Sequence, residues 1–181
     1  MNILVTLNSN YLKPLRVMLK SLFLNNQDER FFIYLMHSSF NDEELDNLNG
    51  YIDFHGSQLA VINVDNRCFA DAPTLLHYTK EMYYRLLAFK FLPKDIDRIL
   101  YLDPDILVIN PIRELYDMDI DGYMYGAAYH NRISIKEINK LRLNPYEIEA
   151  YYNSGVLLMN MGLQRKSIDE QSIYEFVEKN R

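Results

Sequence analysis

The sequence has little cysteine, no tryptophan and fewer positive than negative charges. A single cysteine, Cys68, excludes an intrachain disulfide, and no metal-ligand spacing surrounds it, so a reducing compartment is expected. With 19 Lys and Arg against 25 Asp and Glu, the net charge of −6 argues against an extended nucleic-acid surface, which needs clustered basic residues. We therefore expect no nucleic-acid partner.

Long apolar runs are absent as well. None approaches the roughly 20 residues that are needed to span a bilayer. The first residues, Met1-Asn2-Ile3-Leu4-Val5, enter a strand-like pattern directly, without the basic start and long apolar segment of a signal peptide. The sequence therefore predicts a cytoplasmic protein with no transmembrane segment.

The chain has the composition of ordinary globular material. Its 181 residues, 49% hydrophobic and 24% charged, suffice for one domain with one well-buried core. Short strand-like runs alternate with longer helical patterns, which predicts an α/β fold with a mostly parallel central sheet flanked by helices. We expect strands at residues 3–7, 31–36, 59–64, 99–102, 123–129 and 156–161, and helices at 12–24, 42–52, 74–92 and 167–179.

Local signals refine some of these elements. Asn41 followed by Glu44 matches an N-cap with its capping-box partner, and Thr74 is a plausible N-cap after Pro73. A polar loop or short helix is expected over residues 131–145. The last helix is expected to be one amphipathic element whose buried side carries Ile168, Ile173, Phe176 and Val177.

Two aspartates interrupt the apolar stretch from Arg98 to Pro111. Side chains alternate faces along a strand, so Asp103 and Asp105 project from the same edge. Two carboxylates held so close repel each other unless a cation lies between them, which favours Mg²⁺ or Mn²⁺. Pro104 predicts that the strand ends at Leu102 or Asp103, and carboxyl ends of strands in α/β sheets bind ligands. A solvated surface turn is the alternative.

Three further segments carry groups that could bind a ligand. The polar residues 6–11 lie at a strand-to-helix junction, where backbone amides can receive phosphate or hydroxyl groups; a simple helix cap explains them equally well. They contain no glycine, which counts against a dinucleotide fingerprint or a P-loop. Residues 151–155, ending in Gly155, allow close approach to the backbone, although a plain turn explains them too. Arg85 lies within an expected helix, where most arginines are solvated.

Three segments, in order along the chain, resemble the retaining family 8 glycosyltransferases, which include bacterial lipopolysaccharide galactosyl- and glucosyltransferases and glycogenin. They are Val-Thr-Leu-Asn-Ser-Asn-Tyr at 5–11, Ile-Leu-Tyr-Leu-Asp-Pro-Asp-Ile-Leu-Val at 99–108 and Tyr-Asn-Ser-Gly-Val-Leu-Leu-Met-Asn at 152–160. The resemblance covers essentially the whole chain. It implies a GT-A fold and one nucleotide-sugar-binding catalytic domain over residues 1–181. It also implies metal-dependent transfer of a hexose from UDP-glucose or UDP-galactose to a glycan or other hydroxyl acceptor.

The resemblance assigns roles by position. Asp103 and Asp105 would ligate Mn²⁺ or Mg²⁺, and neither would act as a general acid, general base or nucleophile. Arg85 would reach the diphosphate or the donor sugar, beside Pro104. The uridine would be surrounded by Thr6, Leu7, Asn8, Asn10 and Tyr11, and the transferred sugar would be held by Asn153, Ser154 and Gly155.

The chain departs from the family at several points. Some members carry an acidic residue at the position of Asn8, and some galactosyltransferases carry an aspartate at that of His130, so the donor sugar stays undetermined. The family continues to an Asp-Gln-Asp segment and a histidine that is the third protein ligand of the metal, and neither occurs before Arg181. We therefore expect the C-terminal portion to be missing, with any peripheral membrane association and the binding of a glycan or lipid-linked acceptor residing there. Residues 1–181 alone should bind UDP weakly and transfer little sugar.

Two other functions remain open from the sequence. Haloacid dehalogenase-like phosphatases also place Asp-x-Asp after an apolar strand, with the first aspartate as nucleophile. That motif normally ends the first strand of the domain, whereas about three strand–helix units precede it here. A sugar-nucleotide-binding module without turnover is the non-enzymatic alternative.

Overall fold

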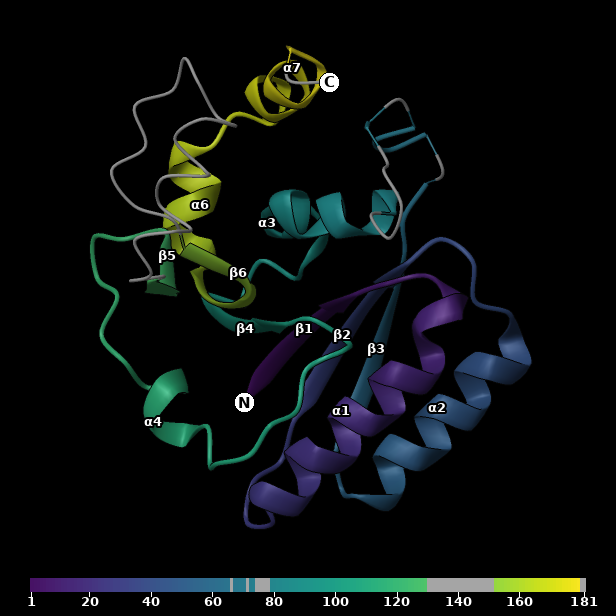
Figure 1. The fold of residues 1–181 in the computed structure, drawn as a ribbon. Helices are drawn as coiled ribbons and strands as arrows, with labels where there is room; N and C mark the ends of the chain where they lie inside the picture. Colours follow the sequence, from purple (N-terminus) through teal and green to yellow (C-terminus); the bar gives the residue numbers. More distant parts are fainter. Residues whose placement is uncertain (66, 71, 74–78, 130–151, 180–181) are drawn as a thin grey trace, which may run out of the picture.

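The sheet has six strands and is mostly parallel, as the sequence predicts. The computed structural model describes residues 1–65, 67–70, 72–73, 79–129 and 152–179 (Figure 1). The strand order is β3-β2-β1-β4-β6-β5; the first four run parallel, and β6 is antiparallel to both β4 and β5. The strands are β1 Asn2–Thr6, β2 Phe32–His37, β3 Gln58–Asn63, β4 Arg98–Leu102, β5 Tyr125–Tyr129 and β6 Tyr152–Asn160.

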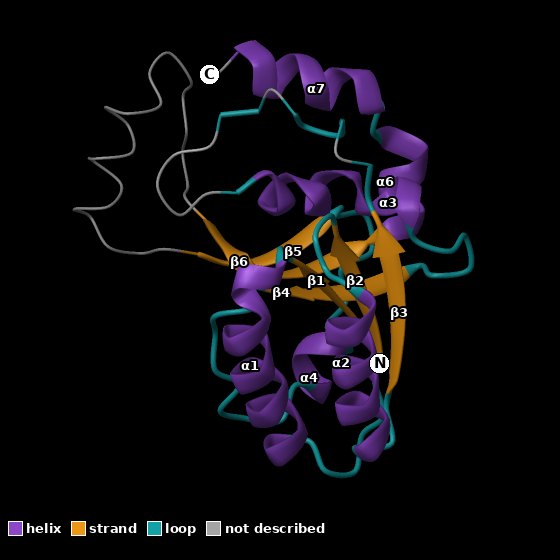
Figure 2. Cartoon of the chain, turned by 90° about the vertical axis from the view of Figure 1, so that its right-hand side faces the viewer, coloured by secondary structure: helices purple, strands orange, loops and turns teal. Residues whose placement is uncertain are grey.

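Helices cover both faces of this sheet, giving three layers (Figure 2). One face is covered by α1 Leu12–Asn25, α2 Asp42–Phe54 and α4 Arg113–Tyr116. The opposite face is covered by α3 Ala88–Phe91, α6 Met161–Ser167 and α7 Glu170–Lys179. Two 3₁₀ helices, η1 Ser9–Tyr11 and η2 Lys80–Leu87, precede α1 and α3.

The core is divided by the sheet into two apolar clusters. Because strand side chains alternate faces, Leu100 and Leu102 of β4 join the cluster under α1, whereas Ile99 and Tyr101 join the cluster under α3. A strand buried on both faces reads as a continuous apolar run, and this is the pattern that precedes Asp103. The core thereby fixes β4 and the direction in which the chain leaves it.

The end of β4 is where the sequence predicts it. The strand stops at Leu102, directly before Asp103 and Pro104. Of the helix expected over residues 74–92, residues 74–78 lie outside the described part; from Lys80 to Leu87 the chain forms the 3₁₀ helix η2, with Thr79 at its N-cap, and only Ala88–Phe91 are α-helical, as α3. Thr74, and the loop or short helix expected over residues 131–145, lie outside the described residues.

The C-terminal helix expected over residues 167–179 forms as α7, which starts three residues late, at Glu170; α6, which ends at Ser167, is not among the expected helices. The chain forms α6 and α7, separated at Ile168 and Asp169. An Asp169 carboxylate oxygen accepts a hydrogen bond from the Ser172 amide at 3.0 Å, so Asp169 caps a new helix instead of continuing the old one. Ile173 and Val177 pack on the core, whereas Phe176 is 58% exposed and does not share their buried side.

None of the described helices combines the length and apolar character required to cross a membrane.

The N-cap of α2 provides a test of how far local sequence signals contribute to stability. The Asn41 side chain accepts from the Glu44 amide at 2.9 Å, and the Glu44 carboxylate accepts from the Asn41 amide at 3.0 Å. We expect Asn41→Ala to lower the free energy of unfolding by about 1 kcal/mol, because the Glu44 amide loses the side-chain oxygen that caps it. Asn49→Ala, at an exposed position of the same helix, is the control and should not destabilise. Urea denaturation measures both; equal destabilisation by the two would contradict the prediction.

Candidate functional site

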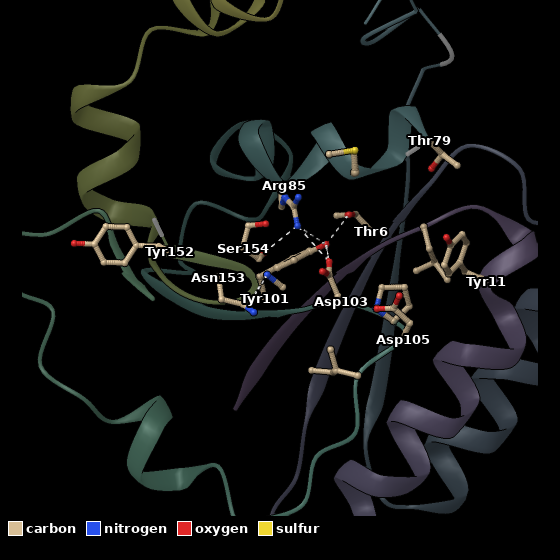
Figure 3. A pocket seen from close by; sticks show the side chains of 15 residues that line it. Thr6, Tyr11, Thr79, Arg85, Tyr101, Asp103, Asp105, Tyr152, Asn153 and Ser154 are labelled. Carbon is tan, nitrogen blue, oxygen red and sulfur yellow. Dashed lines mark hydrogen bonds and ion pairs between the residues drawn. The ribbon is translucent and has the colours of Figure 1, made fainter. Parts of the chain in front are cut away.

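The carboxyl ends of β1 and β4 open into a pocket of ≈ 510 Å³ (Figure 3). In α/β sheets, ligands often bind outside the carboxyl ends of the strands, at the topological switch point where the strand order reverses. The pocket lies at such a point, at the carboxyl ends of β1 and β4, where the order β3-β2-β1-β4 changes direction. It is lined by Thr6, Leu7, Tyr11, Thr79, Met82, Arg85, Tyr101, Asp103, Pro104, Asp105, Ile106, Tyr152, Asn153, Ser154 and Gly155.

Asp103 is held at the centre of a hydrogen-bond cluster. One carboxylate oxygen, Oδ1, accepts from the Tyr101 hydroxyl at 2.5 Å and from Arg85 Nη1 at 3.2 Å. The same Arg85 nitrogen donates to the Ser154 carbonyl at 3.0 Å. The Arg85 side chain is only 11% exposed, so this is a partly buried ion pair and not a solvated arginine. Figure 3 shows these side chains converging from η2, β4 and β6.

Tyr101 contacts both Asp103 and Arg85 from the buried side of this cluster. Its ring is buried, and Arg85 lies over it with the guanidinium carbon 5.0 Å from the ring centroid. Burial raises the pKa of the Tyr101 hydroxyl well above its ordinary value; the Arg85 charge opposes this and the Asp103 carboxylate adds to it. The hydroxyl is therefore neutral and donates a hydrogen bond to Asp103. The Thr6 hydroxyl, on β1, lies 3.4 Å from the Tyr101 hydroxyl.

Gly155 brings β6 against Asp103. The Asp103 amide donates to the Gly155 carbonyl at 2.8 Å, and the Gly155 amide donates to Asn153 Oδ1 at 2.7 Å. A Cβ atom at position 155 would lie 2.6 Å from Asp103 Oδ2, closer than real Cβ contacts come. The glycine is thus required by space, because a side chain at this position would displace the Asp103 carboxylate.

The carboxylates fit a divalent cation. Asp105 is exposed at the pocket, and within the described part of the chain its side chain has no hydrogen-bond partner. The charged groups that line the pocket are Arg85, Asp103 and Asp105, which leaves one net negative charge. No group of three or more His, Cys, Asp or Glu suited to a metal occurs among the described residues. Cations such as Mg²⁺ are commonly held by one or two carboxylates together with substrate phosphates, which this pair could do.

Most of the residues selected from the sequence meet in this pocket, and two do not. Asn8 and Asn10 are absent from its lining. Asn8 instead caps η1, since its Oδ1 accepts from the Asn10 amide at 3.1 Å, and Asn10 is exposed. The helix-cap interpretation that the sequence left open thus describes Asn8. The uracil or ribose contacts expected of these two residues stay a prediction.

Sequence reasoning missed five lining residues: Thr79, Met82, Tyr101, Ile106 and Tyr152. Tyr101 could have been found, because it precedes Asp103 by two positions and strand periodicity brings the two side chains to one side. Thr79 is the N-cap of η2, and Met82 lies within it. Met82 precedes Arg85 by three positions, which is one turn of a 3₁₀ helix, so this spacing could have indicated it.

Known proteins share this fold. The solved structure of galactosyltransferase LgtC in complex with donor and acceptor sugar analogs superimposes with a TM-score of 0.86 and 25% identity, over 100% of this chain and 66% of that one. The domain therefore has the GT-A glycosyltransferase fold, as the sequence predicts.

Sequence relatives agree with the structural likeness. Glycosyltransferase GlyF of Streptococcus pneumoniae serotype 4 is 26% identical over 96% of this chain and 40% of its own length. Lipopolysaccharide 1,2-glucosyltransferase of Escherichia coli K12 is 24% identical over 89% of this chain and 48% of its own. The model of Glycosyl transferase family 8 matches residues 2–181, and the chain belongs to this family. It spans about half the length of these curated relatives.

Proposed function

We propose that the pocket binds the donor of a retaining glycosyl transfer reaction, a UDP-hexose such as UDP-glucose or UDP-galactose, together with Mn²⁺ or Mg²⁺. The observation that carries this proposal is the convergence of Asp103, Asp105 and Arg85 on one pocket at the carboxyl ends of β1 and β4. Family membership favours the same reaction and sets the phosphatase alternative aside. It is also difficult to make Asp103 a nucleophile when one of its oxygens is held by Tyr101 and Arg85.

The charges of the pocket explain why a cation belongs to the proposal. With one arginine against two aspartates, the lining is net negative, and a diphosphate is anionic as well. Bound between Asp103 and Asp105, the metal would neutralise the negative charge that develops on the diphosphate as the sugar departs. Arg85, fixed by the Ser154 carbonyl and the Tyr101 hydroxyl, supplies the only positive side chain among the lining residues and is preorganised to face that charge.

The remaining lining residues divide between two ends of the pocket. Thr6, Leu7 and Tyr11, from the chain after β1, would enclose the uridine, with Asn8 and Asn10 behind them. Asn153, Ser154 and Gly155, at the start of β6, would hold the transferred sugar. The acceptor of the whole protein, a glycan or lipid-linked hydroxyl compound, would approach from the sugar end.

The test is calorimetric titration of the chain with UDP, with and without Mn²⁺. We expect saturable UDP binding in Mn²⁺ and at least about tenfold weaker binding in EDTA, because the net negative lining repels an uncompensated diphosphate. CDP in Mn²⁺ is the matched control and should bind more weakly if the nucleoside end reads the base. Undetectable UDP binding, or binding that is indifferent to the metal, would overturn the proposal.

A further inference from the structure

A buried carboxylate lies behind the pocket and takes no part in the site described so far. Glu81, in the first turn of η2, is 3% exposed and is not a lining residue. Burying an ionised carboxylate costs several kcal/mol unless hydrogen bonds compensate, and an apolar residue of similar volume is often as stable. Stability alone is therefore a weak reason for a glutamate at this position.

The partners of Glu81 come from three segments of the chain. Oε1 accepts from the Ser38 hydroxyl at 2.5 Å, in the segment after β2. Oε2 lies 3.5 Å from Asn8 Nδ2, in the segment after β1. The side chain of Thr79, which precedes η2 and lines the pocket, also hydrogen bonds to the carboxylate. One side chain thus ties together the two loops that follow β1 and β2 and the helix that carries Arg85.

The carboxylate stays ionised in this position. Burial raises the pKa of Glu81, but hydrogen bonds from Ser38, Thr79 and its own backbone amide, with the nearby charge of Lys80, outweigh burial and hold the pKa below its usual range. Charge-assisted hydrogen bonds are stronger than neutral ones, so the ionised carboxylate holds the Ser38 hydroxyl more firmly than a neutral acid would. The same loops are joined by the Ser9 amide donating to the Ser39 hydroxyl at 3.0 Å.

Asn8 connects Glu81 to the turn that lines the pocket. Its amide oxygen accepts from the Asn10 backbone and its amide nitrogen faces Glu81, so both ends of this amide are assigned and its orientation is fixed. Tyr11 and Leu7 flank this turn and line the pocket. With the contact between Asn8 and Glu81, the turn keeps Leu7 and Tyr11 in one arrangement. Without this contact, the turn must be ordered when the ligand binds.

We propose that Glu81 is a positioning residue for the nucleoside end of the donor site, acting through Asn8 and Ser38 without touching the ligand. This inference rests on the proposed function. The buried carboxylate orders the turn after β1 before the ligand binds, so that UDP binding does not cost loop entropy.

The decisive variant is Glu81→Leu, which keeps the volume and removes the charge. We expect thermal stability to fall, because Ser38 and Thr79 lose their acceptor, while UDP affinity in Mn²⁺ falls about tenfold, as for other residues that orient a ligand-binding group. Affinity for inorganic pyrophosphate in Mn²⁺ should stay the same, since Asp103, Asp105 and Arg85 are untouched. A purely structural role would weaken both ligands together.

Two further variants keep the proposal open to disproof. Glu81→Gln retains part of the hydrogen bonding and should bind UDP with an affinity between those of the wild type and the leucine variant. Ser38→Ala removes the 2.5 Å contact alone, with an expected loss of about threefold, and applies if the leucine variant does not fold. Glu114→Gln, at an exposed glutamate of α4, is the matched control and should change nothing.

The outcomes separate the two proposals. If the wild type binds UDP in Mn²⁺ and both Glu81→Leu and Ser38→Ala bind it within twofold of the wild type, the role of Glu81 is refuted and the donor site stands. If the wild type binds pyrophosphate in Mn²⁺ but shows no preference for UDP, the nucleoside end itself is wrongly assigned. If it binds neither, the proposed function fails.

Discussion

Replacing Asp103 by Asn is expected to weaken Mn²⁺-dependent UDP binding by roughly 100-fold, because one partner of a partly buried charge cluster is lost. Two effects add. The cation loses a negative ligand, and Arg85 loses the carboxylate that lies 3.2 Å from its Nη1, so the guanidinium keeps only the Ser154 carbonyl and the Tyr101 hydroxyl as partners. The Tyr101 hydroxyl, 2.5 Å from the same oxygen, faces an amide that is a weaker acceptor. Calorimetry with UDP in Mn²⁺ and in EDTA measures the loss.

Asp105→Asn separates the two effects. Within the described part of the chain Asp105 is exposed and its side chain has no protein partner, so its replacement should reduce UDP affinity in Mn²⁺ but leave the melting temperature in EDTA unchanged. Asp46→Asn, at an exposed position of α2, is the control for the loss of one surface charge. If Asp103→Asn bound UDP in Mn²⁺ as the wild type does, Asp103 would not be a ligand of the cation and the proposed donor site would lose its main support.

The sequence predicts the central part of this fold because several independent signals agree there. The apolar run before Asp103 is buried on both faces as β4, and Pro104 marks the end of that strand because proline cannot donate to a sheet ladder. The capping box of Asn41 and Glu44 starts α2 where it was expected. In such places local propensity and burial point to the same element.

The errors have physical causes that single residues reveal. Periodicity alone does not distinguish a 3₁₀ helix from an α-helix over a few residues, and η2 was therefore assigned as part of a longer helix. Asp169 lies within the expected helix 167–179, but its side chain caps the N-terminus of α7. The apolar Phe176 fits a helical stripe in sequence but is exposed, whereas Ile173 and Val177 of the same helix pack on the core.

The site was less predictable than the fold because its residues depend on tertiary contacts. Arg85 is an ordinary helical arginine in sequence, and only the closeness of η2, β4 and β6 turns it into a buried partner of Asp103. Glu81 offers no sequence signal at all, since its partners Ser38 and Asn8 lie 43 and 73 residues away. Hydrogen bonds across such separations follow from strand order, which sequence patterns specify only loosely.

Gly155→Ala should be nearly as damaging as the loss of Asp103, although it removes no functional group. The added Cβ would lie 2.6 Å from Asp103 Oδ2 and 3.3 Å from Asn153 Oδ1. The Asp103 carboxylate cannot give way freely, because Tyr101 and Arg85 hold its other oxygen. A displacement of about 1 Å in a binding group can cost about 100-fold, so we expect UDP affinity in Mn²⁺ to fall by that order.

Gly50→Ala is the matched control for this substitution. A Cβ at position 50 meets nothing within 4 Å, and within α2 an alanine should stabilise by up to about 1 kcal/mol without affecting UDP binding. Comparing the two variants by thermal unfolding and by UDP titration distinguishes a local clash from a general effect of the extra methyl group. Because the clash acts on Asp103, Gly155→Ala combined with Asp103→Asn should bind UDP no more weakly than Asp103→Asn alone. Additive losses would instead mean that Gly155 acts on the ligand by a route that does not pass through Asp103.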